Sequence, residues 1–286
     1  MYYEYFIILL FVLLFAASIG SFLNVIIYRI PNKLFADEKE YAKEILNQTS
    51  AVDTDNSNDK FSLLEPSRCP KCDNKLKYKH NIPIFGWFLL KGKCYFCKCN
   101  IPFIYPFVEI ITSIIFIAIV YKYGLTQEGY GLLILASFFI ALFFIDQEHQ
   151  ILPDQLTLPL LWIGIGFNIF DTYVPLQESV IGAIIGYMSL WSIFWIYKLI
   201  TKKEGFGYGD FKLLAAVGAW FGYSMLMYTI FMSCMIGLVI ALLTNIFNRK
   251  TNTIAFGPSI ILACIFYLIT KDNIYVWYNH IMMIHP

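Results

Sequence analysis

Two aspartates, Asp146 and Asp210, each lie where an apolar stretch of membrane-spanning length meets a short polar break. A charged side chain in this position is costly, and it is usually retained because it has a function. Two carboxyl groups that lie close together share a proton, so that one is ionised while the other stays protonated. Such a pair can activate a water molecule and polarise a peptide carbonyl. The two residues are therefore candidates for aspartic protease chemistry.

The sequence around each aspartate suits this role but leaves a structural alternative open. Asp146 follows the apolar run SFFIALFFI, which would pack its helix against neighbouring helices. Asp210 follows Gly207-Tyr208-Gly209, whose glycines would permit a kink and a close approach to an extended substrate. Alternatively, Asp210 is the N-cap of the following helix, and Asp146 is a surface carboxylate at a helix end.

Three further acidic residues lie near apolar segments. Asp154 follows Pro153 directly and fits the N-cap of the next helix better than a catalytic role. Glu148 is expected to be solvated. Glu109 lies inside an apolar run, where it is either a hydrogen-bonded structural contact or part of a second site.

The composition of the chain is that of a membrane protein. Of its 286 residues, 58% are hydrophobic and only 14% are charged, whereas soluble domains have roughly 25% charged residues. Since a membrane-spanning helix needs roughly 20 apolar residues, the sequence predicts an all-α polytopic fold with about eight transmembrane helices. We expect them at residues 5–28, 103–121, 129–146, 155–173, 178–200, 211–223, 225–247 and 254–270. The first run has no cleavage pattern and is interpreted as a permanent span.

The distribution of basic residues predicts the orientation of these spans. If the N-terminus lies outside, 19 of the 21 Lys and Arg residues fall in cytoplasmic segments, and only Lys122 and Lys271 lie outside. Short loops rich in Lys and Arg remain cytoplasmic. Asp146 and Asp210 are therefore both expected at the cytoplasmic membrane face.

A segment without a spanning run separates the first two predicted spans. The expected division of the chain is 1–31 (first transmembrane helix), 32–102 (cytoplasmic segment) and 103–286 (transmembrane core). Within the cytoplasmic segment, ADEKEYAKEILNQ at 36–48 predicts a short amphipathic helix, and residues 49–64 predict a flexible loop.

Residues 65–102 contain two C-x₂-C pairs, Cys69 with Cys72 and Cys94 with Cys97. This pattern is typical of a Cys₄ zinc site, and a reducing cytoplasm favours metal binding over disulfides, which remain the alternative. Cys99 is close enough in sequence to compete with Cys97 as a ligand. A closed Cys₄ site has no open coordination position, so its zinc would be structural.

Several motifs together resemble those of the type IV prepilin peptidases, polytopic aspartic endopeptidases of the G-x-G-D type. The resemblance covers most of the chain, and its motifs are GSFLNVIIYRIP at 20–31, SRCPKC at 67–72, NIPIFGWFLLKGKCYFCKCNI at 81–101, YPFVE at 105–109, FIDQEHQILPDQLTLPLLW at 144–162 and GYGDFKLLAAVGAW at 207–220.

This resemblance implies that Asp146 and Asp210 are the catalytic pair. It further implies that the substrates are prepilins and pseudopilins, whose basic leaders are cut at the cytoplasmic face of the bacterial inner membrane. Members with four cysteines also methylate the new N-terminal amine with S-adenosylmethionine. The chain has no G-x-G-x-x-G turn of the Rossmann type, and the partners implied are these substrates and the lipid bilayer, without nucleic acid.

Two other classes of protein remain as alternatives at this stage. A polytopic transporter would use Asp146, Asp210 and Glu109 as ion or proton relays, but it would favour acids near the bilayer midplane and an inverted repeat. A non-catalytic secretion scaffold would use residues 65–102, the cysteine segment, to dock a partner, and it would tolerate Asp→Asn changes.

Overall fold

The computed structural model describes residues 2–45, 66–69, 71–76, 82–202, 207–246 and 255–283. These residues are helical apart from loops and two isolated β-bridges, which confirms the predicted all-α fold. The loop predicted at 49–64 lies outside the described residues. The helices are α1 (Tyr2–Ile45), α2 (Phe85–Leu89), α3 (Ile104–Tyr123), α4 (Gln127–His149), α5 (Asp154–Asn168), α6 (Leu176–Thr201), α7 (Tyr208–Phe221), α8 (Ser224–Ile246) and α9 (Gly257–Met283).

A helix is present at each of the eight predicted spans. Within the described residues, five helices are long and apolar enough to cross a membrane, namely α1, α3, α4, α6 and α8. A shorter apolar stretch, Gly257–Thr270, lies in α9. Helices α5 and α7 have 15 and 14 residues, fewer than the roughly 20 that a perpendicular span requires.

Helix α1 differs from the prediction because it is continuous through Pro31. The first span and the amphipathic helix predicted at 36–48 form a single helix as far as Ile45. Proline removes a backbone donor and normally breaks a helix at a cost of about 3 kcal/mol. The backbone donor that Pro31 lacks would have bonded to the Ile27 carbonyl. The side-chain amide of Asn32 donates to the neighbouring carbonyl, that of Tyr28, at 2.6 Å.

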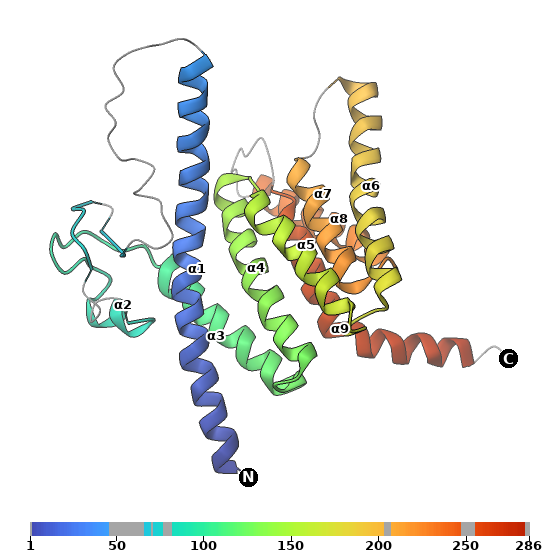
Figure 1. The fold of residues 1–286 in the computed structure, drawn as a ribbon, viewed down its shortest axis with the longest axis horizontal. Coiled ribbons are helices and arrows are strands. Elements are labelled where there is room, and N and C mark those ends of the chain that lie inside the picture. Colours follow the sequence, from blue (N-terminus) through green and yellow to red (C-terminus); the bar gives the residue numbers. More distant parts are fainter. Residues whose placement is uncertain are drawn as a thin grey trace. The chain divides into compact units, whose positions relative to one another are not determined.

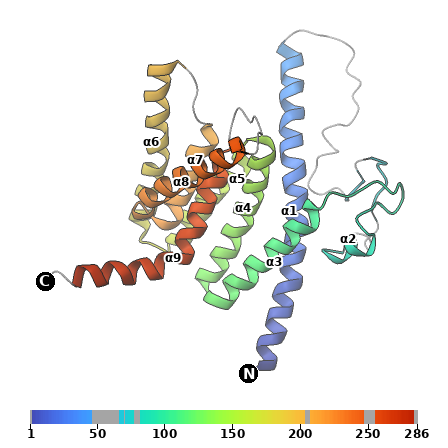
Figure 2. The same ribbon diagram turned by 180° about the vertical axis from the view of Figure 1, so that it is seen from behind.

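The chain forms two compact units, residues 1–141 and residues 142–286, and α4 continues from the first into the second. In the first unit α1 and α3 lie side by side (Figures 1 and 2). Gly20 permits their close approach, since a Cβ atom there would lie 2.7 Å from the Cα of Glu109. The core of this contact contains Val12 and Ala16 of α1 with Phe116 and Val120 of α3.

The domain boundaries expected between residues 31 and 32 and between residues 102 and 103 remain a prediction.

In the second unit the short helix α7 packs against both α5 and α6. Every residue of α7 from Asp210 to Trp220 except Lys212 is buried. The indole N–H of Trp220 donates to the carbonyl oxygen of Leu160 in α5 at 2.8 Å, and the Asn168 amide donates to the carbonyl oxygens of Ala219 and Trp220. These bonds fix the depth of α7 in the unit, and thereby the position of Asp210 at its start.

Helices α6 and α7 approach so closely that only glycine fits at their crossing. A Cβ atom on Gly182 would collide with the carbonyl oxygen of Gly218, and one on Gly218 would collide with the carbonyl oxygen of Gly182. One turn along, a Cβ on Gly186 would lie 2.6 Å from the carbonyl oxygen of Leu214. Small residues at helix contacts are a usual way of bringing backbones together in membrane proteins.

We predict that Gly218→Ala destabilises the protein by about 1–3 kcal/mol, because a methyl group at this backbone crossing forces α6 and α7 apart. Thermal unfolding of the purified protein in detergent, followed by circular dichroism, measures the effect. Gly166→Ala is the matched control, since its Cβ would meet nothing within 4 Å. Equal stability of the two variants would contradict the proposed packing.

Candidate functional site

Asp146 lies in the last turns of α4 and is buried, with 4% of its surface exposed. Its Oδ2 atom accepts a hydrogen bond from the backbone N–H of Gly257, the first residue of α9, at 3.0 Å. The alternative of a surface carboxylate at a helix end is therefore wrong. Instead, the carboxylate lies at the start of α9, where the helix dipole stabilises negative charge.

Asp210 lies in the first turn of α7 and is buried, with 8% of its surface exposed. The N-cap of α7 is Gly207, which makes no side-chain cap bond, so the interpretation of Asp210 as the N-cap is wrong. Its carboxyl group is close enough to Asp146 for the two charges to interact. Two residues 64 positions apart in the sequence thus converge in one buried site. Asp210 lies in the first turn of α7, and Asp146 faces the first residue of α9.

Leu152, in the loop between α4 and α5, packs against the glycines of this site. A Cβ atom on Gly209 would lie 2.6 Å from the Cβ of Leu152, and one on Gly257 would lie 3.1 Å from its Cδ1. The expected reason for Gly207 and Gly209 was a kink beside the substrate. Their backbone has no left-handed φ, and Gly209 is instead required because Leu152 occupies the place of its side chain.

Asp154 was expected to be an N-cap, and this is wrong. Pro153 is the N-cap of α5 and makes no side-chain cap bond. Asp154 instead forms an ion pair with Lys212 of α7. The Lys212 Nζ lies 2.5 and 2.7 Å from the two carboxylate oxygens of Asp154. The pair joins the starts of α5 and α7 two residues from Asp210, although its partial exposure limits its contribution to about 1 kcal/mol or less.

Sequence reasoning did not identify Gly257 or Leu152 as part of the site. Gly257 acts through a backbone N–H and through the absence of a side chain, and neither property distinguishes it from the other glycines. The available signal was AFGPS at 255–259, where glycine precedes proline at the start of an apolar run. That pattern predicts a helix start but not its contact with an aspartate more than 100 residues earlier.

The four predicted cysteine ligands form a cluster. The Sγ atoms of Cys69, Cys72, Cys94 and Cys97 all lie within 4.8 Å of one another. A tetrahedron of Zn–S bonds of about 2.3 Å requires sulfur atoms about 3.8 Å apart, and Cys69 and Cys97 are 3.8 Å apart. The Sγ of Cys99 lies 3.7 Å from that of Cys69, so Cys99 is also within reach. The cluster can hold a metal ion.

Each C-x₂-C pair lies in the same kind of turn. The N–H of Cys69, like that of Cys94, donates to the carbonyl five residues later, and its carbonyl oxygen accepts from the N–H four residues later, at 2.8–3.1 Å. Both turns end in a residue with left-handed backbone, Asp73 (φ 53°) and Lys98 (φ 59°). Two equivalent turns thereby direct two thiols each toward one point, as a tetrahedral site requires.

The environment of Cys69 favours the metal-binding thiolate form. Burial raises the pKa of this thiol, but hydrogen bonds from the backbone N–H groups of Cys72 and Lys71 bring it down to about 6. The Cys72 thiol behaves differently. A backbone hydrogen bond at Asn74 lowers its pKa, whereas desolvation and the neighbouring Cys69 raise it to about 11. The thiols whose pKa is raised by their neighbours would become thiolates only with a cation among them.

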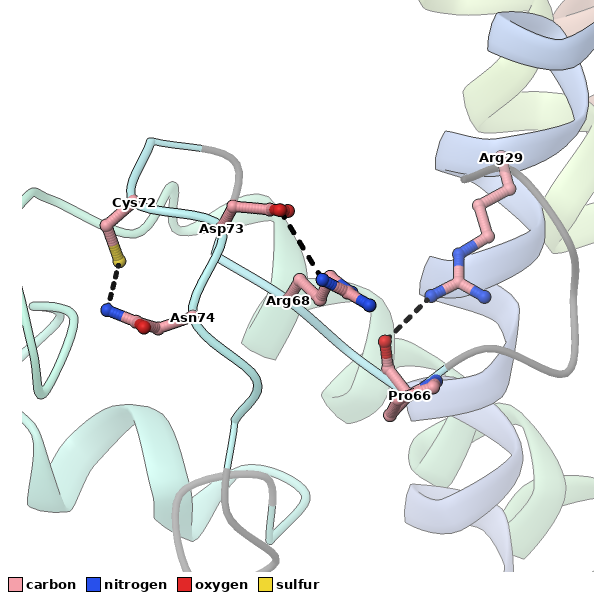
Figure 3. Close-up of polar contacts among 6 residues, drawn as sticks. All are labelled: Arg29, Pro66, Arg68, Cys72, Asp73 and Asn74. Atoms are coloured by element: carbon pink, nitrogen blue, oxygen red, sulfur yellow. Dashed lines mark hydrogen bonds and ion pairs between the residues drawn. The ribbon is translucent and has the colours of Figure 1, made fainter. Parts of the chain in front are cut away.

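Polar contacts attach the cysteine segment to the long helices of its own unit. The guanidinium of Arg29, buried on α1, donates to the carbonyl oxygen of Pro66 at 3.5 Å, as Figure 3 shows. The carboxylate of Glu109, buried on α3, accepts from the N–H of Ile84 at 2.6 Å. Glu109 was expected to be either a structural contact or part of a second site, and its hydrogen bond to Ile84 is the expected structural contact.

Sequence comparisons place these sites in a known family. Residues 14–123 match the bacterial peptidase A24 N-terminal domain, and residues 133–242 match the type IV leader peptidase family. The chain is 44% identical to the prepilin leader peptidase/N-methyltransferase of Dichelobacter nodosus, over 88% of either chain. It is 44% identical to the protein of that name from Neisseria gonorrhoeae, over 91% of this chain and 88% of the relative.

A third relative of the same name, from Pseudomonas aeruginosa, is 38% identical over 90% of this chain and 88% of its own. No solved structure matches the chain. The comparisons span both compact units, so the cysteine cluster and the aspartate pair fall within the matched residues. The chain belongs to the type IV leader peptidase family, and it is a multi-pass membrane protein.

Proposed function

We propose that this protein is a membrane-embedded aspartic endopeptidase that removes the basic leader of prepilins and pseudopilins at the cytoplasmic face of the inner membrane. Asp146 and Asp210 are its catalytic residues. The observation that supports this most directly is the convergence of two buried, electrostatically interacting carboxyl groups from α4 and α7. The names of the relatives supply the class of substrate.

In this mechanism the pair holds one proton. The ionised carboxylate removes a proton from a water molecule, whose oxygen attacks the peptide carbonyl, while the protonated carboxyl group donates to the carbonyl oxygen. The C–N bond of the resulting tetrahedral intermediate then breaks. The proton taken from water passes to the leaving amine, and the pair returns to its starting state with one proton.

We further propose that Cys69, Cys72, Cys94 and Cys97 bind a structural zinc ion. The sulfur separations and the two equivalent turns fit a closed tetrahedral site. Because all four positions are occupied by protein ligands, the metal would stabilise the segment and would not activate water. Zinc would also favour the thiolate form at the cysteines whose pKa is raised by their neighbours.

The names of the relatives suggest a second activity, transfer of a methyl group from S-adenosylmethionine to the new N-terminal amine. A Rossmann-type donor site requires a parallel sheet, and the described residues form only isolated bridges. The methyl donor would thus bind a different kind of site.

We predict that Asp146→Asn and Asp210→Asn each lower the rate of leader cleavage by roughly 10²–10⁴-fold, since each removes a group needed for proton transfer. Cleavage of a model prepilin by the protein in membranes, with product masses measured, tests this. Glu148→Gln is the matched control, since Glu148 is exposed and lies two residues from Asp146. Substantial cleavage by either asparagine variant would overturn the assignment and favour a scaffold.

We predict that Gly257→Ala lowers kcat on the order of 10²-fold with little change in KM. Its Cβ would lie 2.6 Å from the Asp146 Oδ2 and displace the carboxylate, and such a displacement has this effect on rate. Gly237→Ala in α8 is the control, because its nearest neighbour would lie at 3.5 Å. An unchanged kcat in Gly257→Ala would show that Asp146 does not need this position.

We predict that Cys→Ser changes at the four proposed ligands remove zinc from the purified protein and lower its thermal stability, since structural zinc contributes directly to folding. Metal analysis of each variant measures the loss. Cys234→Ser, at an exposed position in α8, is the control. Full zinc content in the ligand variants would refute the site, and comparison of Cys97→Ser with Cys99→Ser identifies the fourth ligand.

A further inference from the structure

The cysteine segment exposes a group of large apolar side chains that its own fold does not cover. In and beside α2 these are Ile82, Phe85, Phe88 and Leu89, with exposed fractions of 46%, 64%, 54% and 72%. We call these four residues the α2 patch. It lies outside the helices that are candidates for crossing the membrane. A contiguous apolar surface of this kind on an otherwise polar segment marks an interaction site.

The α2 patch is joined to the start of a membrane span. The Trp87 ring packs edge-on against Phe103 with ring centroids 5.5 Å apart, and its indole N–H donates to the carbonyl oxygen of Ile101 at 3.1 Å. Phe103 and Ile104, at the start of α3, are themselves exposed. Since Ile104 begins a candidate span, the patch continues the apolar surface that α3 presents to lipid.

The orientation of α2 is fixed by a buried carboxylate. Ile84, the N-cap of α2, has φ 62° and ψ −60°, a backbone conformation that is rare for a β-branched residue. Its N–H donates to the Glu109 carboxylate on α3 at 2.6 Å. Strained conformations persist where surrounding contacts hold them. The contact therefore holds α2 in one orientation next to the start of the α3 span.

Basic and aromatic residues around the patch match the chemistry of a membrane surface. Lys91 and Lys93 follow α2 directly, and both are exposed. Tryptophan concentrates at the boundary between headgroups and acyl chains. Exposed lysines beside an apolar face are attracted to anionic lipid headgroups.

We propose that the α2 patch inserts into the membrane leaflet next to the start of α3, with Lys91 and Lys93 at the anionic headgroups. The cysteine segment is then a monotopic anchor fastened to α3 through Trp87 and Glu109. The occupant of the patch is the lipid bilayer, and neither a second protein chain nor the substrate is needed to cover it. This proposal concerns the membrane and is independent of the proposed catalytic role of the aspartates.

Photo-cross-linking of the full-length protein tests the insertion. Benzoylphenylalanine replaces Phe85 or Phe88, and the protein is reconstituted in nanodiscs of phosphatidylethanolamine and phosphatidylglycerol. Tyr41 is the control position. It is exposed on α1, 12 residues beyond Arg29 and thus about 18 Å further along the helix axis. We expect several-fold more lipid adducts, detected by mass spectrometry, at positions 85 and 88 than at 41.

Equal adduct yields at all three positions would overturn the proposal. So would cross-links from positions 85 and 88 mainly to a second copy of the chain, or to an added prepilin in place of lipid. The metal content of each labelled protein shows that the cysteine segment is intact, so a low yield from an intact segment counts against the proposal.

A charge reversal tests the role of the two lysines. In the benzoylphenylalanine-88 protein, Lys91→Glu with Lys93→Glu should lower the yield of phosphatidylglycerol adducts at least twofold, but not that of adducts in purely zwitterionic nanodiscs. Lys39→Glu, at an exposed site on α1, is the matched control. An equal loss in both kinds of nanodisc would show that the lysines do not contact anionic headgroups.

Discussion

The constraint on which the aspartate site depends is the cost of placing two carboxyl groups where water hardly reaches. A buried carboxylate requires hydrogen-bond donors or helix dipoles in place of water. The structure provides both at the starts of two helices. Asp210 lies in the first turn of α7, and Asp146 accepts the N–H of Gly257 at the start of α9. Backbone groups thus face the charge without adding a cationic side chain, which would neutralise the pair.

Helix α7, which carries Asp210 in its first turn, is short and buried on nearly all sides. Its neighbours therefore determine where Asp210 lies. The glycine contacts with α6 and the Trp220 and Asn168 bonds fix the helix from its flanks. Gly209 and Gly257 then leave room for Leu152 beside the carboxylates. The space around the two carboxyl groups is therefore shaped by two glycines and a leucine, whose side chains carry no reactive group.

The sequence predicted those parts of the site whose presence is costly or chemically specific. Asp146 and Asp210 interrupt apolar runs, and four cysteines at fixed spacing have few other uses, so both groups were visible. Gly257 and Leu152 were not, because nothing in the sequence distinguishes them from the other glycines and leucines of the chain. Two local expectations also failed, namely separate helices before and after residue 32 and an N-cap at Asp154. In the structure α1 continues through Pro31, and Asp154 forms an ion pair with Lys212.

The cysteine segment must be stabilised in another way, because its described residues form almost no core of their own. Among its described residues between 66 and 102, only Cys69, Gly86, Gly92 and Cys94 are buried. Gly92 is covered by the Trp87 ring, which a Cβ there would meet at 2.8 Å. A segment with so little buried apolar surface cannot offset its conformational entropy by packing alone. The proposed metal ligation and the attachment to α1 and α3 can supply the stability that packing lacks. Loss of either should therefore loosen the other, because Ile84 and Trp87, through which α3 holds the segment, lie between the two cysteine turns.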